Sequence, residues 1–155
     1  MRVTALTEWW IRTKGYSYLE FRLVSGSQGL SCGTFGIYLG MTALAKADLS
    51  SYNLGKHPES VAFHCGDCTM TPSPVSSSSS WPGLPQPKHC SVGDRIGLLV
   101  QHSCLYLYRN GQPLGVGPAA TSLKPRMRYF AQVNSGGQQV EIVERSFASM
   151  IAPGL

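Results

Sequence analysis

The chain has 155 residues, which fits one domain, and 43% of them are hydrophobic, which is enough for a core. Only 14% are charged, and the 17 Gly and 10 Pro residues favour short strands joined by turns over long helices. The formal charge of +5 is scattered without interleaved aromatic residues, which does not favour nucleic acid, and no apolar run is long enough to predict a membrane span.

The five Cys residues are an odd number, and the first ten residues carry no secretory pattern. The sequence also lacks an Asn-x-Ser/Thr acceptor site for glycosylation. These features predict free thiols in a reducing compartment, either the cytosol or the nucleus.

The first half of the chain predicts three strands. Hydrophobic and polar side chains alternate along Ser17–Val24, as they do on a half-buried strand. Shorter strands are predicted at Thr34–Gly40 and Val61–Cys65. Between these two, Met41–Ala47 is expected to form a brief helical turn and Ser50–Ser60 a loop.

The stretch Gly66–Ser91 differs from its surroundings because it holds a run of serines and several prolines. Such a composition cannot bury enough apolar surface to offset the entropy lost on ordering. It is predicted to be a long disordered loop inserted between strands. A domain boundary here is the competing interpretation, and it is disfavoured because neither half has enough strands for its own core.

The second half predicts strands at Val92–Val100, Cys104–Arg109, Pro113–Val116, Tyr129–Val133 and Gln139–Val143. Asn110-Gly111 predicts a hairpin turn, because both residues accept the positive φ that a tight turn requires. A closing hairpin around Ser135–Gly137 is expected to join the last two strands. Many short strands and almost no helix predict an all-β fold, an antiparallel β-sandwich of two packed sheets.

Several motifs occur in an order that resembles the SPRY domain family. They lie at Lys14–Phe21, Gly36–Met41, Leu54–Phe63, Val92–Leu99, Leu105–Gly111 and Tyr129–Val133. The neuralized-homology repeat, also a β-sandwich, shares the pattern of the second half. Leu19 and Val61 occupy positions where the SPRY pattern has Trp.

The resemblance divides the chain into an N-terminal segment of residues 1–13, a SPRY-like sandwich over 14–146 with the flexible insert 66–91, and a C-terminal tail of residues 147–155. Few residues precede the first motif, so the leading strands of the family are expected to be short or absent, as in a fragment or short isoform. Trp9 and Trp10 are expected to cover the sheet edge left open.

The resemblance implies a non-catalytic module that binds a short segment of a protein or peptide partner through loops at one end of the sandwich. Family members serve as substrate-recognition parts of ubiquitin ligases or as signalling adaptors, although this chain has no RING, F-box or SOCS-box pattern. Because aromatic and Arg residues anchor many interfaces, the candidate partner-binding residues are Tyr52, Asn53, Arg126, Arg128 and Tyr129. Tyr16 and Tyr18 are alternatives, with side-chain packing as their competing interpretation.

Two other functions stay open. His64 and the pair Cys65 and Cys68, with Cys90 downstream, supply zinc-ligand types, so a small zinc-stabilised regulatory domain held by the three cysteines is one alternative. Their spacing fits no standard zinc motif, and Cys is common in cores. A basic nucleic-acid-binding domain is the other alternative. No nucleophile elbow or paired carboxylates occur, and neither a cofactor nor a small-molecule substrate is expected.

Overall fold

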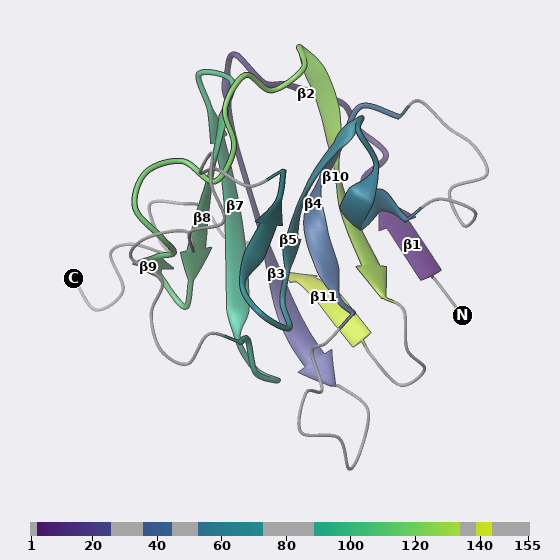
Figure 1. Cartoon of the computed structure of the whole chain (residues 1–155), viewed down its shortest axis with the longest axis vertical. Coiled ribbons are helices and arrows are strands. Elements are labelled where there is room, and N and C mark those ends of the chain that lie inside the picture. Colours follow the sequence, from purple (N-terminus) through teal and green to yellow (C-terminus); the bar gives the residue numbers. More distant parts are fainter. Residues whose placement is uncertain (1–2, 26–35, 45–52, 73–88, 134–138, 144–155) are drawn as a thin grey trace.

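The computed structural model describes residues 3–25, 36–44, 53–72, 89–133 and 139–143. These residues form two antiparallel sheets packed face to face, which confirms the predicted β-sandwich (Figure 1). None of the described helices is long or apolar enough to cross a membrane.

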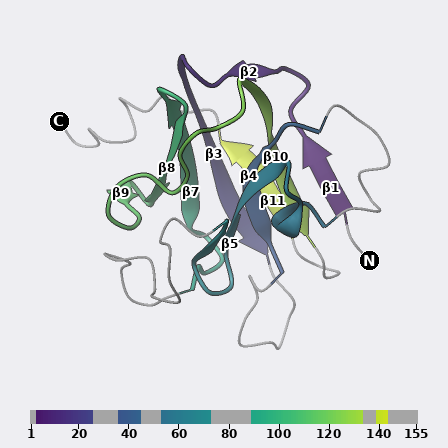
Figure 2. The ribbon, with the colours of Figure 1, turned by 45° about the horizontal axis from the view of Figure 1, so that its top comes forward.

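The first sheet has the spatial order β1 (Val3–Leu6), β10 (Arg126–Val133), β4 (Tyr38–Thr42), β5 (Ser60–His64) and β6 (Thr69–Thr71), and β2 (Ile11–Arg12) pairs with the start of β10. The second sheet has the order β11 (Gln139–Val143), β3 (Tyr16–Ser25), β7 (Arg95–Gln101), β8 (Cys104–Arg109) and β9 (Gln112–Pro113). A short 3-10 helix, η2 (Leu54–Lys56), lies between β4 and β5 in the chain. Figure 2 shows the second sheet crossing behind the first.

Alternating side chains from both sheets fill the space between them. From the second sheet, the buried side chains include Leu19, Phe21, Leu23, Ile96, Leu98, Val100, Leu105 and Leu107. From the first sheet, they include Leu39, Met41, Phe63, Met70, Met127 and Tyr129. This period of two explains why these segments form strands, because each buries its apolar side chains on one face.

The outer face of the first sheet is also partly covered. Leu54 of η2 packs there against Ala62 and Phe130. Gly40 lies between these two residues in the sheet register, and a Cβ atom at Gly40 would lie 2.0 Å from the carbonyl oxygen of Val61. The close approach of β4 and β5 therefore requires glycine at this position.

The turns around the β7–β8 hairpin are held by one carboxylate. Asp94 Oδ2 accepts hydrogen bonds from the Ser91 backbone N–H at 2.8 Å and from Arg109 Nε at 3.0 Å. Asp94 Oδ1 accepts one from Asn110 Nδ2 at 3.0 Å. Asn110 and Gly111 have φ values of 52° and 85°, which confirms the predicted tight turn.

Two predictions about the path of the chain are wrong. β10 and β11 do not pair as a hairpin around Ser135–Gly137, because β10 lies in the first sheet and β11 pairs with β3 in the second. By crossing between sheets, the chain supplies hydrogen-bond partners to one edge of β3. Met41 and Thr42 continue β4 where a helical turn was expected, because Met41 fills the core and Thr42 accepts a hydrogen bond from Ser60.

The N-terminal segment and the insert both contribute strands. β1 and β2 lie within residues 1–13 and pair with β10, so the leading strands are short but present. β6 and the buried Cys90 lie within the predicted insert 66–91, so its two ends belong to the sandwich. The centre of the insert, residues 73–88, lies outside the described residues.

Candidate functional site

Strand β2 and the start of β10 place three arginines on the outer face of the first sheet. Met127 and Tyr129 point into the core, so Arg126 and Arg128 point outward. Arg126 lies directly opposite Arg12 in the antiparallel register, so these two side chains share one face. Figure 2 shows β2 beside the first part of β10 at one end of the sandwich.

Trp10 lies against these arginines. The guanidinium carbon Cζ of Arg128 is 4.5 Å from the centre of the Trp10 ring, and that of Arg126 is 5.5 Å from it. A cation–π contact of this kind contributes about 0.5–1 kcal/mol at an exposed site. We call Trp10, Arg12, Arg126 and Arg128 the arginine–tryptophan surface.

Arg128 is held in place from two sides. Its Nη2 donates a hydrogen bond to the carbonyl oxygen of Leu44 at 3.1 Å, while its guanidinium lies over Trp10. A side chain that is already positioned loses less conformational entropy when a partner binds. The surface therefore has an ordered centre at Arg128, with the more exposed Arg12 and Arg126 beside it.

Positive charge is concentrated around this surface. Residues 12–14 and 124–128 are joined by backbone hydrogen bonds and contain five of the 13 Lys and Arg residues. Lys124 lies 3.5 Å from the carboxylate of Glu59, whereas Arg12 and Arg126 form no ion pair with the acidic side chains that the structure describes. Like charges directly opposite each other destabilise a sheet, so the Arg12–Arg126 pair is costly for the isolated fold.

The predicted site residues Asn53, Arg126 and Arg128 all lie on the outer side of the first sheet. Asn53 caps η2, because its Oδ1 accepts a hydrogen bond from the Gly55 backbone N–H at 3.1 Å. Asn53 therefore has a structural role as the N-cap of η2, independent of any contact with a partner. The predicted site residue Tyr52 lies outside the described residues.

Tyr129 does not belong to an exposed surface. Its side chain is 1% exposed and lies between the sheets. Its hydroxyl is 3.0 Å from Ser17 Oγ and 3.3 Å from the carbonyl oxygen of Leu98, and it donates to them across the core. Burial raises the pKa of Tyr129 above its usual value of 10.0 despite the hydrogen bond with Ser17. The prediction that Tyr129 contacts a partner is therefore corrected. Tyr129 is buried between the two sheets and links them through its hydroxyl.

Tyr16 and Tyr18 lie on the second sheet, on the other side of the sandwich from the arginine–tryptophan surface. Tyr16 is 58% exposed. Tyr18 covers the backbone of Gly97 and donates a hydrogen bond to Glu20 at 3.1 Å, which fits the packing interpretation for that residue. These tyrosines would form a separate surface.

Sequence reasoning missed Trp10 and Arg12 as site residues. Trp10 was expected to cover a sheet edge, but it lies against two arginines that follow it by more than one hundred positions in the chain. The alternation of Ile11 and Arg12 is too short to identify a strand. Only the pairing of β2 with β10 identifies these two residues as neighbours of the arginines, and no local sequence pattern predicts that pairing.

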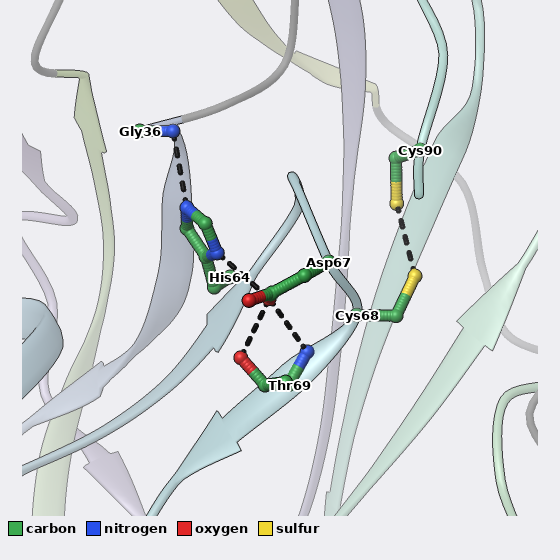
Figure 3. A network of polar contacts seen from close by, with 6 residues as sticks. All are labelled: Gly36, His64, Asp67, Cys68, Thr69 and Cys90. Carbon is green, nitrogen blue, oxygen red and sulfur yellow. Dashed lines mark hydrogen bonds and ion pairs between the residues drawn. The ribbon is translucent and has the colours of Figure 1, made fainter. Parts of the chain in front are cut away.

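The turn between β5 and β6 is ordered by His64 and Asp67 (Figure 3). The Gly36 backbone N–H donates to His64 Nε2 at 3.1 Å, and His64 Nδ1 lies 2.8 Å from Asp67 Oδ1. Asp67 also accepts hydrogen bonds from the backbone and hydroxyl of Thr69. Partial burial works to raise the pKa of Asp67, but the hydrogen bonds from Thr69 and His64 outweigh it and hold the pKa below 3.8.

The three predicted zinc ligands come together inside the core. Cys68 Sγ lies 4.0 Å from Cys90 Sγ, and the Cys90 backbone N–H donates to the Cys65 carbonyl at 2.8 Å. Figure 3 shows His64 directed at Gly36 and Asp67 and not at the thiols. Across the described ranges, no three side chains of the ligating types are grouped so as to hold a metal ion. The contacts favour packing of thiols over a zinc site.

The surroundings of two of these thiols raise their pKa values. The contact with Cys90, followed by burial, raises the pKa of Cys68, and the contact with Cys65, together with burial, raises that of Cys90. A protonated thiol is a poor nucleophile and a poor metal ligand. The contacts and burial therefore disfavour the thiolate forms of Cys68 and Cys90 in the packed core.

Comparison with known proteins gives information on the fold. No known family pattern and no curated protein matches the sequence. Solved structures do match: the SPRY domain of human HERC1 is 15% identical with a TM-score of 0.64 over 91% of this chain and 81% of that one. A human SPRY domain is 19% identical with a TM-score of 0.59 over 91% of this chain and 83% of that one.

A third match is the PSpry domain of TRIM65. It is 12% identical, with a TM-score of 0.56 over 92% of this chain and 71% of that one. The three matches agree with the motif resemblance noted in the sequence. The chain therefore has the SPRY fold.

Proposed function

We propose that this chain is a non-catalytic protein-interaction module that binds a short segment of a partner protein through the arginine–tryptophan surface. The observation that carries the proposal is the pairing of Arg12 with Arg126 beside Trp10 on the outer face of the first sheet. Trp and Arg are the residue types most often found to dominate binding energy at protein interfaces. The SPRY fold supports the same class of function.

The location favours binding over structural support. The arginines lie on strands β2 and β10, whose inner faces are fixed in the core, and Trp10 immediately precedes β2, so the surface is rigid before a partner binds. A rigid surface keeps the entropy cost of association low. The exposed Arg12 and Arg126 form no ion pair with a described acidic side chain, so they add no salt bridge to the stability of the sandwich.

We further propose that the module works as a recognition subunit with other chains. A substrate-recognition role in ubiquitin ligation and a role as a signalling adaptor both fit the SPRY fold. In either case the partner segment would bind the arginine–tryptophan surface, while the catalytic step would take place on another protein. A reducing compartment, the cytosol or nucleus, is the proposed location.

Affinity capture from cytosol with quantitative mass spectrometry tests the proposal. The full chain would be compared with a double variant, Trp10→Ala with Arg126→Ala. Arg95→Ala is the matched control, because Arg95 lies on the outer face of the second sheet. We expect a set of proteins that the wild type and the control retain and the double variant loses.

Thermal unfolding of all three proteins would be measured in parallel. Equal unfolding temperatures would exclude misfolding as the reason for lost partners. The proposal fails if every captured protein is retained equally by the well-folded double variant. In that case another face of the sandwich would be responsible for binding.

A further inference from the structure

We infer that the arginine–tryptophan surface takes an extended, acidic segment of a partner protein, with carboxylates at alternate positions. This inference rests on the proposed function and names the chemistry of its partner. Arg12 and Arg126 face each other across two strands and form no ion pair with a described acidic side chain. Their mutual repulsion is relieved when a carboxylate lies between them.

The spacing of the arginines selects an extended partner. Arg126 and Arg128 are two residues apart on one strand, which places their Cα atoms about 7 Å apart. Side chains on one face of an extended peptide repeat at the same interval. Acidic residues at positions i and i+2 of such a segment therefore match the two arginines, whereas the same positions on a helix point in different directions.

The contact with Trp10 leaves the arginines able to bind carboxylates. Arg126 and Arg128 place their guanidinium groups over the Trp10 ring, a cation–π contact that uses the face of each guanidinium. The N–H groups at the edge of a guanidinium form a planar fork that matches a carboxylate. Nη2 of Arg128 already donates a hydrogen bond to the Leu44 carbonyl oxygen. Of the two arginines over the ring, Arg126 therefore has more N–H groups available to bind a carboxylate.

The same contact disfavours a nucleic acid as the partner. Proteins that bind single strands present open aromatic faces on which bases stack. Here the Trp10 ring already has two guanidinium groups over it. Nucleic-acid affinity also depends on neutralising many phosphates along a groove, and this surface is a compact group of three arginines.

Selection from a displayed library of short random peptides against the full chain tests the inference. We expect enrichment of peptides with Asp or Glu at positions separated by one residue. The substitution Arg126→Gln should weaken the binding of an enriched synthetic peptide about tenfold, because one charge-assisted contact is lost. Arg95→Gln, with the same change of charge on the second sheet, should leave the affinity unchanged.

Two more measurements sharpen the test. Arg126→Lys keeps the charge and removes the planar fork, so it should recover only part of the affinity lost in Arg126→Gln. Replacing each acidic residue of the peptide by its amide should abolish the dependence on Arg126. A short oligothymidylate serves as the nucleic-acid probe.

The outcomes separate this inference from the proposed function. Enriched peptides without acidic residues that still depend on Trp10 and Arg126 would overturn the inference and leave the binding surface standing. Peptides that bind all surface variants equally, or no enrichment at all, would overturn both. An oligothymidylate that binds more tightly than the best acidic peptide, and does so through Arg126, would overturn the inference in favour of nucleic acid.

Discussion

Removing the hydroxyl of Tyr129 should weaken the joining of the two sheets. In Tyr129→Phe, the ring still fills the core, but the hydrogen bonds to Ser17 Oγ and the Leu98 carbonyl are lost. One hydroxyl hydrogen serves these two acceptors, and Ser17 is partly exposed and is able to bind water instead. The expected loss is therefore about 1 kcal/mol of unfolding free energy at neutral pH, or a fall of about 2–4 °C in Tm.

The same variant should behave differently at high pH. Burial raises the pKa of Tyr129 above 10.0, so the folded protein holds this proton more tightly than the unfolded chain does. The stability linked to this proton is complete below pH 10 and is lost as the pH rises from there toward the folded pKa. The loss amounts to about 1.4 kcal/mol for each pH unit, so the advantage of the wild type should vanish within about one unit above pH 10.

Urea unfolding of both proteins across the alkaline range measures this difference. The six other tyrosines are present in both proteins, so their ionisation cancels in the comparison. Two stability curves that run parallel through the alkaline range would refute the reasoning, because a buried hydroxyl must be deprotonated at a cost. Binding of an enriched peptide should be the same for both proteins at neutral pH, since Tyr129 is not on the arginine–tryptophan surface.

Three further predictions concern the scaffold. Gly40→Ala should destabilise the fold by at least about 3 kcal/mol in urea unfolding, because its Cβ meets the backbone of β5, while Gly15→Ala, which has space, should cost far less. Asp94→Ala should cost about 2–3 kcal/mol by the same assay, because it removes the ion pair with the largely buried Arg109 and the hydrogen bonds from Ser91 and Asn110; a loss no larger than that of exposed Glu141→Gln would contradict this. When the native protein is treated with an alkylating reagent and followed by mass spectrometry, Cys104 should be alkylated before Cys68, because Cys68 is buried and its pKa is raised by its contact with Cys90 and by burial. Alkylation of Cys68 as fast as that of Cys104 would contradict this prediction.

The prediction of the site from sequence was partial for a physical reason. Arg126 and Arg128 were identified because Arg is common at interfaces, and their outward direction follows from the alternation along β10. Tyr129 was wrongly placed among the exposed aromatic anchors, because it starts a predicted strand next to Arg128, whereas the alternation along β10 turns its side chain inward. Its neighbour Phe130 is buried too, on the opposite face, because η2 covers that face with Leu54.

Local chemistry by itself determined the class of fold. Alternation along β3 and the positive φ values accepted by Asn110 and Gly111 depend only on neighbouring residues, so the strands and the tight turn could be read directly. The arginine–tryptophan surface was decided by tertiary structure. Trp10 and Arg128 meet only because the edge of β10 offers unpaired backbone groups that β2 satisfies. Pairing between distant segments depends on the free energy of the whole core, which cannot be predicted from a short stretch of sequence.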